Sequence, residues 1–228
     1  MKSDSQIDKW VRWLDIIEKE IYELLMLRYV FWEVQKIIKA NRRIQSDGYF
    51  YEWLGITYSK TASIGVRRQL DSGSRVITLG RLLSEIQRSP TILSLSRFEN
   101  MYTKGHRTRT EEQQMFYNLE KRRAGKEFGQ FSGKAKVHVN PLIVCKDLIL
   151  LNRACQPILK YVNKRVAHRD KKEFTTLPTF NDLDEAIDLL LEVFKKYMLL
   201  LRGVQYGIRV EPQWDWKEVF KVAWLERT

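Results

Sequence analysis

The chain has 228 residues, of which 44% are hydrophobic, and its formal net charge is +12 with a pI of about 9.7. The length suits one domain with a packed core and room for an insertion, and the basic excess favours a polyanionic partner, namely RNA, DNA or anionic lipid. A merely solvated basic surface is the alternative. The longest apolar runs fall far short of the roughly 20 residues of a membrane span, and the charged N-terminus does not resemble a signal peptide. We therefore expect a cytoplasmic protein with no membrane contact.

The two cysteines do not indicate a disulfide or a metal site. Cys145 and Cys155 are ten residues apart, which on one helix is about 15 Å and too far to bridge. The sequence contains no CxxC pair, no cluster of cysteine and histidine, no GxGxxG and no P-loop. We expect reduced thiols, no metal and no cofactor.

Helical periodicity dominates the first half of the chain. Apolar residues recur at steps of three and four from about residue 5 to residue 41, which predicts a long helix or two helices in line. A second helix is predicted over Tyr49–Leu70 and a third over Leu79–Arg88, with Thr78 as its N-cap.

The stretch from Lys104 to Lys136 is basic, rich in glycine and poor in aliphatic residues. Residues 111–123 could form a helix, whereas residues 124–136 are interpreted as a loop or a mobile segment. Its Phe128, Phe131 and lysines could contact RNA by stacking and charge. We interpret residues 104–139 as a basic, partly flexible insertion between two helical halves of one domain, 1–103 and 140–228.

The C-terminal half again has helical periodicity. Asn140 and Pro141 predict a helix start, and Pro157 predicts a kink in that helix. A last long helix is predicted from about Asn181 to Gly203, where glycine should end it. Strand signals are nearly absent, so the fold class is all-α, a helical bundle.

Polar and basic residues gather where the helix after Pro157 is expected to end. Asn163, Lys164, Arg165, His168 and Arg169 occur within seven residues. RNA cleavage without a metal needs a group that transfers protons near neutral pH, which suits histidine, and a cation that stabilises charge on the phosphate, which suits arginine. An asparagine amide can orient either group. The alternative is structural, because a helix C-terminus favours cations and a capping histidine through its dipole.

The segment Tyr161–His168 resembles the "Y-R-N-K-x-x-A-H" signature of the HEPN superfamily. Two further stretches are similar to the abortive-infection (Abi) branch of that superfamily, which contains bacterial phage-defence proteins. They are Arg68-x-Leu70-Asp71 followed by Leu79-x-Arg81-Leu82-Leu83, and a tail from Trp214 to Trp224.

The resemblance implies an all-α, often dimeric protein that binds RNA or cleaves it without a metal. It implies that Asn163 and His168 are catalytic residues. The arginine of the signature corresponds to Val162, so Arg165 is our candidate for the missing cation. Lys164 and Arg169, and the pair Arg67 and Arg68 from the second helix, are our candidates for RNA binding.

Three functions remain open from the sequence. The first is a HEPN-like RNA-binding protein or metal-independent endoribonuclease, active as a homodimer in phage defence or as a toxin with a partner antitoxin. The second is a non-catalytic helical interaction or regulatory subunit of a defence complex, which Val162 favours. The third is a DNA regulator, which only the basicity suggests, because no helix-turn-helix spacing is present.

Overall fold

The computed structural model places most of the chain. The residues it describes are 2–45, 48–106, 108–134, 137–166, 177–205, 207–208, 210, 212 and 214–222. Within these ranges the protein is all-α, as predicted, and it contains no strand. One isolated antiparallel bridge joins Ser94 to His138.

Three helices of the first half begin and end close to the predicted residues. They are α1 (Lys2–Ala40), α2 (Tyr49–Leu70) and α3 (Leu79–Arg88), and a short 3₁₀ turn, η1 (Arg42–Ile44), follows α1. The Thr78 hydroxyl accepts a hydrogen bond from the backbone N–H of Arg81 at 3.0 Å, so the predicted N-cap of α3 is confirmed.

The second half also follows the predicted pattern, with one difference. Helix α6 (Pro141–Ala154) begins after Asn140, whose side chain accepts a hydrogen bond from Leu142 N at 2.9 Å. Instead of a single kinked helix, the chain breaks at Cys155, and Pro157 lies in the first turn of a separate helix, α7 (Gln156–Tyr161). The last long helix is α8 (Phe180–Arg202), which ends at Gly203 in the left-handed conformation, as predicted.

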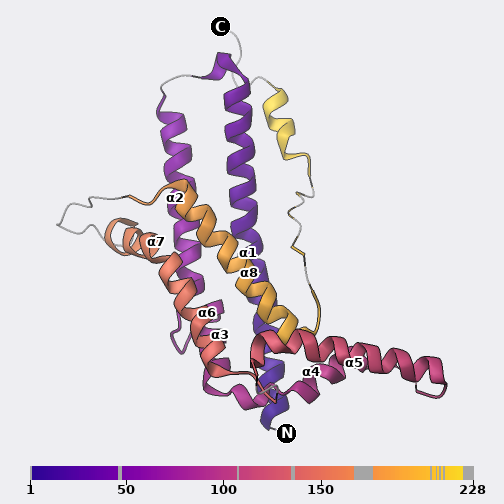
Figure 1. Ribbon diagram of the computed structural model, residues 1–228. Helices are drawn as coiled ribbons and strands as arrows, with labels where there is room; N and C mark the ends of the chain where they lie inside the picture. The colour runs from indigo at the N-terminus through magenta and orange to yellow at the C-terminus, as the bar shows by residue number, and fades with distance from the viewer. Residues whose placement is uncertain are drawn as a thin grey trace.

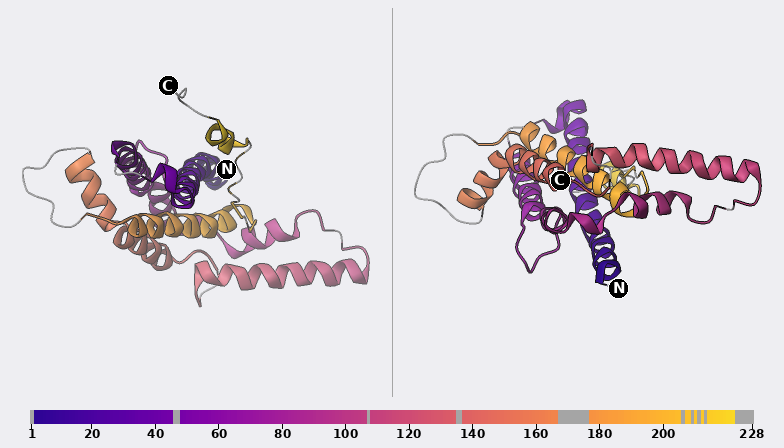
Figure 2. Two further views of the ribbon diagram at one scale, coloured as in Figure 1. Left: turned by 90° about the horizontal axis from the view of Figure 1, so that it is seen from above. Right: turned by 60° about the horizontal axis from the view of Figure 1, so that its bottom comes forward.

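The predicted insertion contributes the second helix of a helical arm, whose first helix precedes residue 104. After the 3₁₀ turn η2 (Pro90–Ile92), helix α4 (Leu95–Thr103) and helix α5 (Glu111–Ser132) pack against each other and project from the bundle (Figure 2). Our loop interpretation of residues 124–136 is therefore wrong for Ala124–Ser132, and residues 135 and 136 lie outside the described part. Phe128 and Phe131 are buried against Phe98, so they do not form an RNA-stacking surface.

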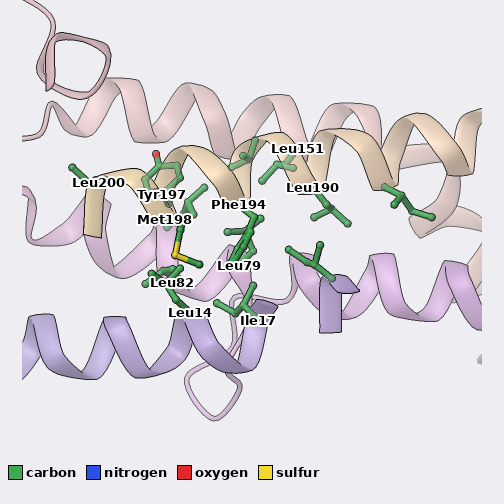
Figure 3. Packing of buried hydrophobic residues seen from close by; sticks show 14 of the residues in the cluster. Leu14, Ile17, Leu79, Leu82, Leu151, Leu190, Phe194, Tyr197, Met198 and Leu200 are labelled. Atoms are coloured by element: carbon green, nitrogen blue, oxygen red, sulfur yellow. The ribbon is translucent and has the colours of Figure 1, made fainter. Parts of the chain in front are cut away.

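One apolar core joins the long helices. Helix α8 contacts α1, α2 and α6, and α3 packs on α6, so that α8 lies across the bundle (Figure 1). Figure 3 shows side chains from these helices meeting in the core: Leu14, Ile17, Leu79, Leu82, Leu151, Leu190, Phe194, Tyr197, Met198 and Leu200. Burial of this apolar surface provides the main stabilisation of the bundle. None of the described helices combines the length and the apolar character that crossing a membrane requires.

The C-terminal tail runs back beside α1 (Figure 1) and forms a 3₁₀ helix, η4 (Trp216–Lys221). The Trp216 ring meets Tyr29 edge-on, with centroids 6.3 Å apart, and Lys217 Nζ lies 2.6 Å from Glu33 Oε2. Trp214 is 81% exposed, so not every tryptophan of the tail covers the core.

Candidate functional site

The signature segment forms an unusual turn. Directly after α7 the helix widens into a π-helical turn, η3 (Val162–Val166). Val162 is only 2% exposed and Val166 packs against the core, whereas the side chains of Asn163 and Lys164 are exposed. Such turns are rare and occur frequently at functional sites. The two valines therefore anchor the turn in the core, and Asn163 and Lys164, which lie between them, face solvent.

The structure brings Arg67 and Asn163 together. Arg67 lies in the last turn of α2, which packs against both α7 and η3. Its Nε donates a hydrogen bond to Asn163 Oδ1 at 2.8 Å, although the two residues are 96 positions apart in the chain. Both side chains are exposed. A predicted RNA-binding residue and a predicted catalytic residue thus lie side by side.

Arg68, the next residue, has a different environment. Its Nη1 lies 3.4 Å from Glu20 Oε1 on α1. Glu20 also accepts a hydrogen bond from the buried Gln69 amide, and Gln69 Oε1 accepts one from the backbone N–H of Leu79 at 3.1 Å. Arg68 therefore takes part in the corner where α1, α2 and α3 meet, and the structure separates it from η3.

Arg165 lies in the π turn, and its expected role as the missing cation stays a prediction. It is half-buried and follows Asn163 by two residues, and helical side chains two positions apart do not face each other. Among the described residues, Arg165 makes no hydrogen bond or ion pair with Asn163 or with any other side chain. His168 and Arg169 lie outside the described residues, so the roles predicted for them stay predictions.

A cavity of about 490 Å³ lies beside this pair, between α2, α7 and the start of α8. Its α2 wall includes Glu52, Ser59 and Ser63, and Tyr161 closes it near η3. Arg67 follows Ser63 by one helical turn, so it continues the same face of α2 toward Asn163. The Arg67–Asn163 pair therefore lies one helical turn of α2 beyond the cavity.

Sequence reasoning identified Arg67 and Asn163 separately but missed that they touch. A usable signal was present in α2, where Glu52, Ser59, Ser63 and Arg67 recur at helical spacing in a segment with many apolar residues. A polar stripe of this kind predicts a face that is not fully covered by the core. It does not predict which distant segment lies next to that face.

The arrangement can bind an anion. A neutral asparagine accepts the Arg67 Nε–H without neutralising the guanidinium, which leaves the terminal amino groups free to donate to phosphate oxygens. Within the described part of the chain, no carboxylate forms an ion pair with Arg67 or Lys164. The surface around η3 is therefore cationic and uncompensated there.

The HEPN_AbiU2 family model, described as AbiU2, matches residues 7–223. The match includes the motif turn, the arm and most of the tail, and it agrees with the all-α bundle. No curated protein and no solved structure shows significant similarity to the chain. The chain therefore belongs to the AbiU2 family, in the abortive-infection branch of the HEPN superfamily.

Proposed function

We propose that this protein binds single-stranded RNA at the surface formed by η3 and the last turn of α2, and cleaves it there without a metal ion. The observation that carries the proposal is the exposed Arg67–Asn163 pair, a charged donor group that no described carboxylate neutralises. Lys164 extends the same cationic surface. Cations of this kind bind the phosphate backbone irrespective of sequence.

The neighbouring cavity supports RNA over a small inorganic anion as the ligand. Its volume of about 490 Å³ is in the range of small-molecule sites and accommodates a nucleobase. Tyr161 offers an aromatic ring, and the Ser59 hydroxyl, which donates its proton to the Ile56 carbonyl, can still accept a hydrogen bond from a base edge. A phosphate held at Arg67 would place the adjacent nucleotide at the mouth of this cavity.

In the proposed reaction the ribose 2′-oxygen attacks the adjacent phosphorus. A P–O2′ bond forms, the P–O5′ bond breaks, and the products are a 2′,3′-cyclic phosphate and a 5′-hydroxyl. The 2′-hydroxyl loses a proton and the departing 5′-oxygen gains one, and histidine can transfer protons in both directions near neutral pH. We assign this proton transfer to His168, in a homodimer in which two motif turns share one cleft.

Substitution of His168 tests the catalytic part of this proposal. Purified protein is incubated with a fluorescent single-stranded RNA in excess EDTA, and cleavage is followed on denaturing gels. We expect wild-type protein to cleave and His168→Ala to lose at least 100-fold in rate while it retains its RNA affinity. His138→Ala is the matched control, because His138 lies at the base of the arm, and it should cleave normally. Equal cleavage by wild type and His168→Ala would refute the assignment.

A second function is favoured by the burial of Val162. Where the signature has arginine, this chain has a core side chain that is 2% exposed, and a protein without that cation could act as a non-catalytic subunit of a defence complex. RNA binding without cleavage under all conditions, together with a stable complex with a protein encoded beside it, such as an antitoxin, would support this second function. Biological action in phage defence or as a toxin is part of both proposals.

A further inference from the structure

We infer that Arg67, from α2, supplies the phosphate-binding guanidinium that the signature normally carries at the position of Val162. The inference rests on the proposed RNA binding and specifies its central contact. It replaces our sequence-based choice of Arg165 with a residue nearly one hundred positions earlier in the chain. Three observations support it: the directions of the side chains, the uncompensated charge of Arg67 within the described residues, and the different partner of Arg68.

The directions of the side chains exclude positions 162 and 165 of the signature as the source of this guanidinium. The Val162 side chain is buried, so an arginine there would have to leave the core before it reached a ligand. Arg165 lies two residues beyond Asn163 and does not face the same way. Arg67 approaches from the neighbouring helix and reaches Asn163 itself, with 2.8 Å between Nε and Oδ1.

The hydrogen bond fixes the guanidinium without consuming its charge. Arginine has five N–H donors in a planar fork, and the contact with Asn163 uses the one at Nε. No described residue bonds to the two terminal amino groups, and the edge that they form suits a bidentate contact with phosphate. Asn163 Nδ2 adds a further donor beside it. Asn163 is therefore a positioning residue for Arg67 as well as a possible ligand of the phosphate.

Arg68 provides an internal control. It has the same side chain, is adjacent in sequence and is also exposed, but its guanidinium is directed to Glu20 on α1. A carboxylate partner lowers the local positive potential and occupies donors that a phosphate would need. If general basicity governed RNA binding, the two arginines would contribute alike. If the site is at η3, Arg67 will contribute far more.

The test is a binding measurement with a 12-nucleotide, fluorescein-labelled, 2′-O-methyl oligoribonucleotide, which cannot be cleaved. Anisotropy is recorded for wild type, Arg67→Ala, Arg67→Lys and Arg68→Ala over a range of salt concentrations. We expect Arg67→Ala to weaken binding about tenfold or more and to reduce the slope of log K against log salt by about 0.7, the value for one phosphate contact on a single strand. Arg68→Ala should change affinity less than threefold.

Arg67→Lys separates charge from geometry. Lysine keeps the positive charge but lacks the planar fork, so we expect the salt slope to recover while the affinity recovers only in part. The melting temperature of each variant verifies that the exposed substitutions leave the fold intact. On a cleavable RNA, Arg67→Ala should lower kcat about 100-fold with a smaller change in KM, because the guanidinium stabilises charge that develops in the transition state.

The outcomes separate this inference from the proposed function. RNA binding by wild type with equal losses in Arg67→Ala and Arg68→Ala, or with no loss in Arg67→Ala, would overturn the role of Arg67 and leave RNA binding standing. A wild-type protein that binds no RNA would overturn both. A selective loss in Arg67→Ala, with the fold intact, would support both.

Discussion

Two of the places where cations lie in the described part of this protein differ in what surrounds them. At the contact of α1 with α3, Glu85 accepts hydrogen bonds from Lys9 Nζ at 2.9 Å, Trp10 Nε1 at 2.9 Å and Arg81 Nη2 at 2.7 Å. At the contact of α2 with η3, Arg67 meets a neutral asparagine instead. The first group of charges is compensated and largely buried. The second is exposed and, within the described residues, uncompensated.

The difference separates structural charges from charges that can bind a ligand. Burial alone would raise the pKa of Glu85, but the hydrogen bonds from Lys9, Trp10 and Arg81 outweigh it and hold that pKa below its usual value. The carboxylate therefore stays ionised and joins two helices. An uncompensated guanidinium contributes little to folding, because it remains in water, and retains its attraction for an anion.

Removal of the Glu85 charge should have the largest effect on stability. Its side chain is 10% exposed, and Glu85→Gln leaves Lys9 and Arg81 without a counter-charge, so we expect a loss of about 2–3 kcal/mol in the free energy of unfolding. Urea denaturation followed by circular dichroism measures it. The matched control is Glu192→Gln in an exposed pair with Lys195, which should cost less than about 0.5 kcal/mol. The RNA affinity of the folded Glu85→Gln protein should be unchanged. A parallel loss of affinity would contradict the distinction between structural charges and charges that bind a ligand.

Restoration of the signature arginine should have the next largest effect. Val162→Arg places a charge at a core position, which lowers the free energy of unfolding. Because a long side chain can still reach toward water at the nearby surface, we expect this loss to be limited to about 2 kcal/mol, with no gain in RNA affinity. Urea denaturation and fluorescence anisotropy provide the two readings. Lys164→Arg, two residues further along the same turn and exposed, should leave both stability and RNA affinity unchanged. A stable Val162→Arg protein with tighter RNA binding would show that the signature position can still hold the cation.

The smallest effect concerns a pair that is compensated but near the surface. The hydrogen bond from Lys217, with a second from Lys36, lowers the pKa of Glu33 from 4.5 to about 2. Because the pKa is depressed in the folded state, the attachment of η4 to α1 is fully present above about pH 4.5 and is lost as the pH falls from there toward 2. The protection factors of the η4 amides, which are the intrinsic exchange rates at each pH divided by the measured rates, should fall over that window.

The melting temperature of the whole protein depends mainly on the helical bundle, so it should not track the loss of η4 protection over the same pH range. Lys217→Gln removes the ammonium group that lowers the pKa of Glu33 most. The η4 amides should then lose their protection from hydrogen exchange already at neutral pH. Protection factors in η4 that do not change between pH 5 and pH 3 would indicate that the Trp216 contact with Tyr29, and not the ion pair, holds the tail.

The arm shows why part of the fold could not be predicted. Gly125 and Gly129 lie inside α5, where each glycine costs about 1 kcal/mol relative to alanine, so local propensity favoured a loop. The packing of Phe128 and Phe131 on α4 offsets that cost, since tertiary contacts provide most of the stability of a protein helix. The aromatic residues that suggested RNA contacts are the ones that fold the arm.

The sequence by itself determined the features that depend on near neighbours. The limits of α2 and α3, the caps at Thr78 and Asn140 and the end of α8 at Gly203 follow from periodicity and from side chains that satisfy adjacent backbone groups. The signature around Asn163 was likewise readable, and with it the family.

Only the tertiary structure decided which cation accompanies the signature. The π turn directs Val162 into the core, and the packing of α2 on η3 brings Arg67 to Asn163 across 96 residues of chain. Sequence spacing governs contacts within one helix, whereas a contact between two helices depends on how their apolar faces fit. For this reason the sequence pointed to Arg165, whereas in the folded chain Arg67 is the arginine that contacts Asn163.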